Sequence, residues 1–131
     1  MKYLFDTDTL IYLLKGNKNI ALRVSETPIE AISTTIINYT ELLYGALKSD
    51  RVKQNLNTIT TLFNNLEIIT FCKECAFIFA EEKAKLKNKG NLIADLDLMI
   101  ASIAIHHKKI LVTNNFKHFD RLTNLEIDNW S

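Results

Sequence analysis

Four oxygen-bearing side chains, far apart in the sequence, could together hold a metal ion: Asp6, Glu41, Asp97 and Asn115. Asp6 and Asn115 each follow a short apolar run of the kind that forms a buried parallel strand. The C-terminal ends of such strands form the edge of an open α/β sheet where ligands bind. An all-oxygen set suits a hard cation such as Mg²⁺, with Mn²⁺ as an alternative, and suits zinc poorly.

Carboxylates that share one site need a cation or a proton. Two of them about 4 Å apart repel by roughly 4 kcal/mol at an effective dielectric near 20. Asp6 is the central candidate, because a desolvated carboxylate without a cation is strongly unfavourable. Other residues of this set have alternative roles. Glu41 could be a solvated helix residue. Next to Asp6, we expect either Thr7 or Asp8 to cap the helix that follows.

Apolar periodicity predicts the elements that must position these side chains. Strands are expected at residues 3–5, 29–33, 66–71, 110–113 and 125–127, and helices at 8–15, 20–24, 36–47, 50–65, 74–89 and 98–107, with a short helical turn at 116–119. The helix at 98–107, opened by residues 95–97, is apolar almost all round and should be buried. The alternation predicts a three-layer α/β/α sandwich with a central parallel sheet of about four or five strands, in one domain spanning the whole chain, residues 1–131.

The composition is that of an ordinary folded protein, since 47% of the 131 residues are hydrophobic and 24% are charged. The net charge of +1 gives no overall attraction to nucleic acid or to an acidic membrane, so a polyanion must be held by a local basic patch. Asp6 and Asp8 interrupt the N-terminal apolar run too early for a signal peptide, and no later run is long enough to span a bilayer. We therefore expect a cytoplasmic protein.

The two cysteines, Cys72 and Cys75, form a C-x-x-C pattern. The pattern could be half of a zinc site or a redox pair, but a second ligand pair at zinc spacing is missing. We interpret both thiols as small apolar structural groups near a helix start. His106 and His107 end a helix about 15 Å long whose other end carries Asp97, so we interpret them as C-terminal helix residues rather than as ligands.

Five segments, in order along the chain, carry a resemblance to a known family. They are LFDTDTLIYL at 4–13, ELLYG at 41–45, DLMIAS at 97–102, VTNN at 112–115 and the closing residues 125–130. Each segment is weak by itself, but the ordered set is specific. The chain resembles the PIN-domain ribonucleases, and among them the VapC and FitB-like toxins of bacterial type II toxin–antitoxin pairs.

The resemblance implies a metal-dependent endoribonuclease in which Asp6, Glu41 and Asp97 are the catalytic acids and bind the ion. Asn115 stands where many relatives carry a fourth Asp, which weakens any second metal site. Asp8 stands where the family usually has Asn, and it either restores the lost charge or only caps a helix. Asp95 has no family counterpart, and we interpret it as a helix N-cap. The reaction would be metal-assisted hydrolysis of phosphodiester bonds in structured RNA, with transfer RNA as a candidate.

The resemblance also implies a homodimer that is neutralised by a cognate antitoxin. The helices around residues 42–62 could supply a dimer face or could be plain core. Basic side chains are the candidates for contact with RNA or antitoxin, above all Lys83, Lys87 and Arg121, with Lys48 and Arg51 in addition.

Two other functions are left open by the residues. The run Asp6-Thr7-Asp8-Thr9 also looks like the Asp-x-Asp start of haloacid-dehalogenase-like phosphatases, although that family has Thr at the place of Leu10 and a longer chain with a cap. The second alternative is a binding module that keeps its acids as a relic and acts only by holding its antitoxin, which the uncharged Asn115 suggests.

Overall fold

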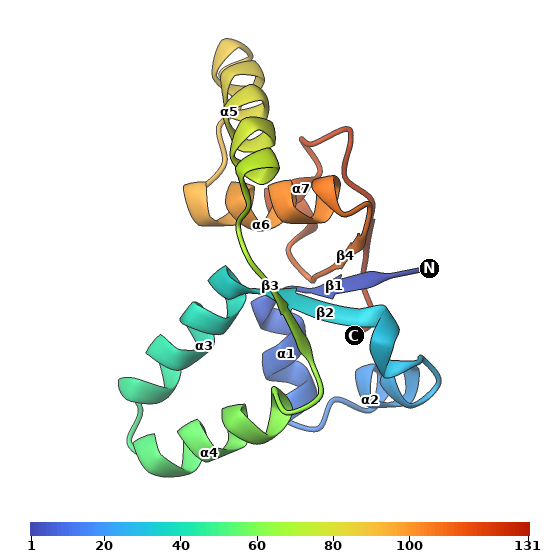
Figure 1. The fold of residues 1–131 in the computed structure, drawn as a ribbon, viewed down its shortest axis with the longest axis vertical. Helices are drawn as coiled ribbons and strands as arrows, with labels where there is room; N and C mark the ends of the chain where they lie inside the picture. Colours follow the sequence, from blue (N-terminus) through green and yellow to red (C-terminus); the bar gives the residue numbers. More distant parts are fainter.

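Five short strands form one parallel sheet at the centre of the molecule (Figure 1). The structure, a computed structural model, describes all residues from 1 to 131. The strands are β1 (Tyr3–Phe5), β2 (Ile32–Thr35), β3 (Glu67–Ile69), β4 (Ile110–Val112) and β5 (Ile127–Asp128), in the sheet order β3-β2-β1-β4-β5. Because β1 is the middle strand, its carboxyl end lies between those of β2 and β4.

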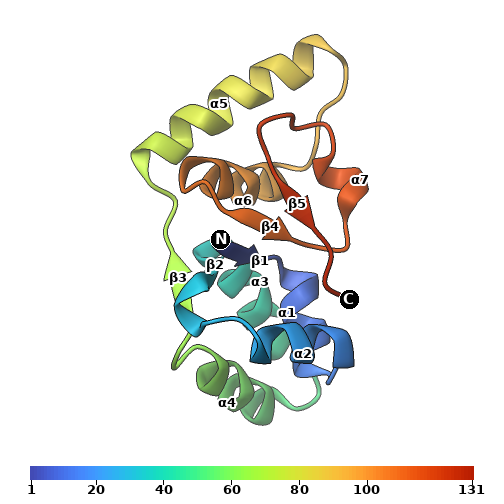
Figure 2. The same cartoon turned by 90° about the vertical axis from the view of Figure 1, so that its right-hand side faces the viewer.

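Seven α-helices and one 3-10 turn connect the strands. They are α1 (Thr7–Leu14), α2 (Lys18–Ser25), the 3-10 turn η1 (Ile29–Ala31), α3 (Ile36–Leu47), α4 (Val52–Leu62), α5 (Lys73–Asn88), α6 (Asp95–His106) and α7 (Phe116–Phe119). Figures 1 and 2 show α5, α6 and α7 on one side of the sheet and α1 to α4 on the other. The predicted three-layer α/β/α sandwich is therefore confirmed. None of the helices combines the length and the apolar character needed to cross a membrane.

Alternate side chains of the central strands fill two apolar clusters. Leu4 and Leu111 pack into the cluster on the α5–α6 side, whereas Phe5 and Val112 pack into the cluster on the α1–α4 side. The pairing of Leu4 with Leu111 and of Phe5 with Val112 in the β1–β4 register keeps like faces together. Ile100 has no exposed surface, which agrees with the prediction that α6 is the buried helix.

The C-terminal segment is tied to β1 by Trp130, whose side chain is 3% exposed. Its ring lies edge-on to Tyr3 and Phe5, with centroid distances of 4.8 and 5.1 Å. The guanidinium of Arg23 lies 4.3 Å from the centroid of the same ring. Aromatic pairs at these distances stabilise the fold beyond the burial of the rings themselves, so Trp130 anchors the C-terminal segment to β1 within the second cluster.

Several element boundaries differ from those that periodicity predicts. The expected strand at 29–33 is wrong in its first half, because Ala31 N–H donates to the Pro28 carbonyl at 2.9 Å and closes the turn η1, so that β2 begins only at Ile32. The apolar run at 66–71 contains a strand of three residues, since β3 is an edge strand that pairs only where β2 lies beside it. The helix expected at 50–65 is shorter and spans Val52–Leu62.

Candidate active site

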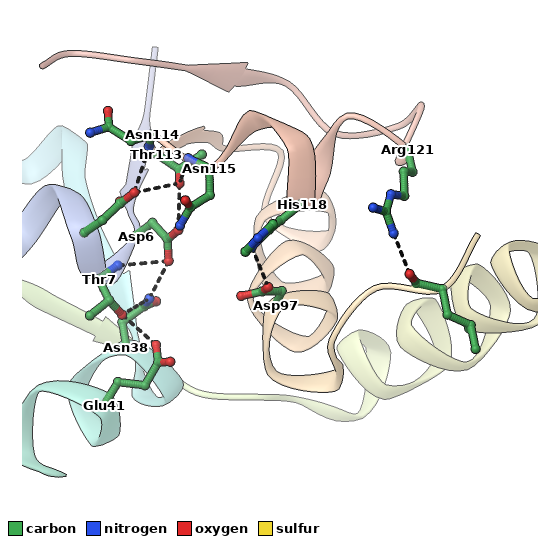
Figure 3. Close-up of polar contacts among 12 residues, drawn as sticks. Asp6, Thr7, Asn38, Glu41, Asp97, Thr113, Asn114, Asn115, His118 and Arg121 are labelled. Atoms are coloured by element: carbon green, nitrogen blue, oxygen red, sulfur yellow. Dashed lines mark hydrogen bonds and ion pairs between the residues drawn. The ribbon is translucent and has the colours of Figure 1, made fainter. Parts of the chain in front are cut away.

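Asp6 lies at the carboxyl end of β1 and is only 4% exposed. Its Oδ1 accepts hydrogen bonds from the Thr7 backbone N–H at 2.9 Å and from Asn38 Nδ2 at 3.1 Å. Its Oδ2 accepts from the Thr113 hydroxyl at 2.7 Å. Three donors from three segments thus fix the orientation of one buried carboxylate (Figure 3).

The expectation that Thr7 or Asp8 caps the first helix is wrong, because the N-cap residue of α1 is Asp6 itself. Asp6 is the single residue between the end of β1 at Phe5 and the start of α1 at Thr7, so it is the residue in the cap position. Asp6 therefore has two roles. It satisfies a free N–H of the first turn, and it presents a carboxylate at the edge of the sheet.

The pKa of Asp6 is raised from 3.8 to about 6. Burial is the main cause, because it disfavours the charged form, and the nearby Asp8 and Asp97 carboxylates raise the pKa further. The hydrogen bonds from Thr113 and from the Thr7 N–H act in the opposite direction. A carboxylate held in this way gains most from a cation, since a positive charge offsets both the burial and the repulsion.

Glu41 is connected to Asp6 through two polar side chains. The Thr7 hydroxyl donates to Glu41 Oε1 at 2.6 Å and accepts from Asn38 Nδ2 at 2.9 Å, while the same Nδ2 donates to Asp6. Asn38 has no exposed surface and is held by Thr35, with which it forms the capping box at the start of α3. Glu41 therefore lies partly buried at the site, not on a freely solvated face.

Asp97 belongs to the first turn of α6, and its Oδ2 lies 3.1 Å from Nδ1 of His118. Figure 3 shows this pair beside the Asp6 group. Asp97 and His118 also line a small pocket together with Arg121 and the chain from Leu92 to Ala94. Asp97 and Asp6 are thus brought to the same edge of the sheet from separate elements.

Asp95 does not cap α6, contrary to expectation. The N-cap is Ala94, Asp95 is the first helical residue, and its Oδ1 lies 2.9 Å from Lys83 Nζ. An acid is favoured by the helix dipole in the first turn as well as at the cap, and the ion pair with Lys83 on α5 accounts for its place here.

Asp8 organises the loop that follows β4. Its Oδ2 accepts from the backbone N–H of Asn114 at 2.9 Å, and the Thr113 hydroxyl lies 3.5 Å away. Asn115 is exposed, and its backbone N–H donates to the Thr113 hydroxyl at 3.0 Å. Asp8 therefore holds the segment that carries both Thr113 and Asn115 against the end of β1.

The three basic candidates differ in their surroundings. The side chain of Lys83 is engaged by Asp95, whereas Lys87 is exposed in the last turn of α5. Arg121 donates to the Leu92 carbonyl and lines the same pocket as Asp97. Arg121 is therefore the only one of these three basic residues that lines this pocket together with a candidate acid, Asp97.

The residues that the sequence did not indicate are the ones that orient the acids. Thr7, Asn38 and Thr113 carry the hydrogen bonds to Asp6 and Glu41, and His118 contacts Asp97. The only signals were local ones, since Thr7 is a candidate helix cap and Thr35-x-x-Asn38 resembles a capping box. The resulting arrangement offers carboxylate, amide and hydroxyl oxygens and no sulfur, which suits a hard divalent cation.

Comparison with known proteins agrees with this geometry. The PIN-domain family model matches residues 3–125. Ribonuclease VapC2 of Rickettsia felis is 37% identical, with 99% of this chain and 98% of the relative covered, and the tRNA(fMet)-specific endonuclease VapC of Salmonella typhimurium is 28% identical, with 99% and 98% covered. The crystal structure of VapBC2 from Rickettsia felis bound to a DNA fragment from its promoter contains a chain that superposes with a TM-score of 0.93 at 34% identity, over 100% of both chains.

Proposed function

Because the chain belongs to the PIN-domain family and, within it, to the VapC ribonucleases, we propose that it is an endoribonuclease toxin that requires a divalent metal ion and is neutralised by a cognate antitoxin. The observation that carries the metal requirement is the buried Asp6, whose pKa is raised to about 6 by burial and by neighbouring acids. The phosphatase alternative is dropped, since the PIN-domain match covers residues 3–125.

Asp6, Glu41 and Asp97 are the proposed catalytic acids and metal ligands. Asn115, on the loop after β4, is a weaker ligand. Asp8 accepts a hydrogen bond from that loop, and its main role is to hold the loop in place. The ion would be Mg²⁺, or Mn²⁺ in its place, because both prefer oxygen ligands. When bound, it supplies an activated water and offsets the charge of the phosphate.

The chain's own residues hold these acids in place before any ion arrives. Thr113 and Asn38 fix the two oxygens of Asp6, and Thr7 fixes Glu41. Such second contacts orient ligands and typically matter ten- to a hundred-fold for metal affinity or activity. No histidine or serine nucleophile is needed in this scheme.

The proposed substrate is structured RNA, with initiator transfer RNA as the first candidate because a relative over the full chain is named as a tRNA(fMet)-specific endonuclease. With a net charge of +1, the chain must hold RNA by local contacts. Arg121, in the pocket beside Asp97, is the leading candidate, and Lys87 and Lys83 are further ones.

We propose a cognate antitoxin and a second copy of the chain as partners. The structure superposed above is a VapBC complex, which supports an antitoxin as partner. The predicted dimer face lies on α3 and α4. In these helices Leu42 and Ile59 are buried in the core, whereas the side chains of Tyr44 and Leu47 on α3 are 66% and 60% exposed. Any contact between copies through α3 would therefore use these exposed side chains.

The test is cleavage of purified RNA. We expect the wild-type protein to cut initiator transfer RNA in Mg²⁺ or Mn²⁺, EDTA to stop the reaction, and Asp6→Asn and Asp97→Asn to be inactive but folded by circular dichroism. Asp50→Asn, which removes an exposed acid away from the site, is the matched control and should cut normally. Full activity in excess EDTA contradicts the metal requirement. Antitoxin binding without cleavage at any metal concentration indicates the binding module instead.

A further inference from the structure

A second group of metal-ligating side chains lies outside the acidic site. Cys72, Glu74 and His106 each offer one ligand atom, and the three atoms all lie within 4.8 Å of one another. Cys72 is the N-cap of α5, Glu74 is in its first turn, and His106 is the last residue of α6. Cys72 and His106 are partly buried, and Glu74 is exposed.

The packing of two helices creates this group. Figure 2 shows α5 and α6 side by side, with the start of α5 next to the end of α6. Cys75 Sγ lies 2.9 Å from Cys72 Sγ, but it is not one of the three atoms that lie together, and Cys75 is fully buried in the apolar cluster on the α5–α6 side of the sheet. One thiol, one imidazole and one carboxylate thus meet from two separate helices.

We propose that Cys72, Glu74 and His106 form a binding site for Zn²⁺ that is distinct from the acidic site. Zinc binds thiolate, imidazole and carboxylate ligands in a tetrahedral set, and three protein ligands with a water in the fourth position are one of its arrangements, whereas Mg²⁺ and Mn²⁺ prefer oxygen alone. The chain therefore offers two sites that differ in the metal they prefer. The start of α5 supplies Cys72 and Glu74, and the end of α6 supplies His106.

Cys75 would lie behind the ligands rather than act as one of them. Its Sγ lies 2.9 Å from Cys72 Sγ, and its side chain is fully buried. When the ion displaces the proton of the Cys72 thiol, as in other thiolate sites, the Cys75 S–H can donate a hydrogen bond to the bound thiolate.

The ion would join the end of α6 to the start of α5, at the opposite end of α6 from Asp97. Asp97 and His106 are nine positions apart along α6, which corresponds to about 14 Å. The site is therefore too far from the acids to take part in RNA cleavage. It would stabilise the packing of α6, which carries Asp97, against α5.

Cobalt is the probe for this site, because thiolate-bound Co²⁺ has a strong charge-transfer absorption that oxygen-bound Co²⁺ lacks. The full chain, kept reduced by a non-thiol reductant under anaerobic conditions, is titrated with Co²⁺ and then with Zn²⁺. We expect the charge-transfer band to saturate at one Co²⁺ per chain and Zn²⁺ to remove it. We also expect one equivalent of Zn²⁺ to raise the melting temperature.

Two variants and a control assign the ligands. Cys72→Ser should lose the band while keeping its helix cap, since a Ser hydroxyl accepts the same hydrogen bond from the Cys75 N–H. His106→Gln should bind Co²⁺ at least about ten-fold more weakly. The matched control is His107→Gln, which changes the adjacent ring and should bind like the wild type. Absence of a charge-transfer band in the wild type, or equal affinity in His106→Gln and His107→Gln, overturns the proposal.

Discussion

Replacement of Asp6 by Asn is expected to abolish RNA cleavage and, in the metal-free protein, to make the fold more stable at neutral pH. The reason is that the charged form of this carboxyl is disfavoured in the folded chain. Burial, with Asp8 and Asp97 nearby, raises its pKa from 3.8 to about 6. A neutral amide at the same position avoids that unfavourable charge, and a metal ion is what offsets it in the active protein.

The magnitude follows from this difference in pKa between the folded and the unfolded chain. About two units at 1.36 kcal/mol per unit correspond to about 3 kcal/mol. Because the folded state holds the proton more tightly than the unfolded chain, Asp6 lowers the free energy of unfolding progressively as the pH rises from about 4 to about 6, and by a constant amount above that range.

The hydrogen bonds reduce the expected gain. The amide oxygen of the Asp6→Asn variant can still accept from Thr7 N–H and Asn38, and the amide NH₂ can donate to the Thr113 oxygen. Because this last hydrogen bond must reverse its direction, part of the stabilisation is lost. We therefore expect the free energy of unfolding to rise by about 1–3 kcal/mol at about pH 8 and hardly at all at about pH 4.

Urea unfolding in EDTA at about pH 4 and about pH 8 measures this difference for both proteins. The matched control is Asp120→Asn, an exposed acid that should show no gain at either pH. Added Mg²⁺ should stabilise the wild type and leave Asp6→Asn unchanged, since an ion stabilises only the form that binds it. A wild type that is more stable than Asp6→Asn at about pH 8 without metal would show that the buried Asp6 carboxylate does not destabilise the fold.

Three further outcomes follow from single contacts. Thr113→Val removes the hydrogen bond that most lowers the pKa of Asp6, so the acid limb of the cleavage pH profile should move to higher pH, as rates measured across pH will show. Thr7→Val removes the donor to Glu41, so cleavage should fall about ten-fold or more and need more Mg²⁺, which a metal titration of the rate checks. Trp130→Ala opens a cavity over β1 and should lower the free energy of unfolding by about 3–5 kcal/mol in urea.

The two threonine variants have conservative partners, and Trp130→Ala has a surface control. Thr113→Ser and Thr7→Ser keep the hydroxyl and should restore the pH profile and the metal requirement. Phe77→Ala truncates an aromatic ring that is 70% exposed, so it should change stability by about 0.5 kcal/mol or less. An unshifted pH profile in Thr113→Val, or a Thr7→Val enzyme as active as the wild type, contradicts the roles given to those hydroxyls.

Among the three acids, Asp6 could be predicted from a local rule alone. Asp6 ends a short apolar run, and parallel strands gather their carboxyl ends at one edge. Glu41 and Asp97 depended on the resemblance to a family as much as on periodicity. The structure brings all three acids to the edge of the sheet where β1 ends. The central position of β1 in the sheet is therefore the feature of the fold that does most to bring the acids together.

The residues that orient the acids could not be predicted, because their contacts join distant parts of the chain. The Thr113 hydroxyl reaches Asp6 across 107 residues of sequence, and Asn38 reaches it across 32. No local pattern contains such pairs. The same limit applies to the Cys72 and His106 group, which exists only because α5 and α6 pack against each other.

Local rules also failed where two of them favour the same residue type. Asp is favoured both at an N-cap and in the first helical turn. The sequence therefore predicts Asp95 as an N-cap when it is the first residue of α6, and it predicts Thr7 or Asp8 as the cap of α1 when the cap is Asp6. The hydrogen bond from the Thr7 N–H identifies Asp6 as the cap of α1, and the ion pair with Lys83 accounts for Asp95 in the first turn of α6. Neither contact can be predicted from composition.

The most direct test of the central claim is the number of Mn²⁺ ions bound per chain, measured by calorimetry at about pH 8, where Asp6 is ionised. We expect the wild-type protein to bind one ion at the acidic site and Asp6→Asn to bind none, with affinity for the wild type falling as the pH is lowered through about 6. Equal binding of Mn²⁺ by the wild type and by Asp6→Asn would contradict it.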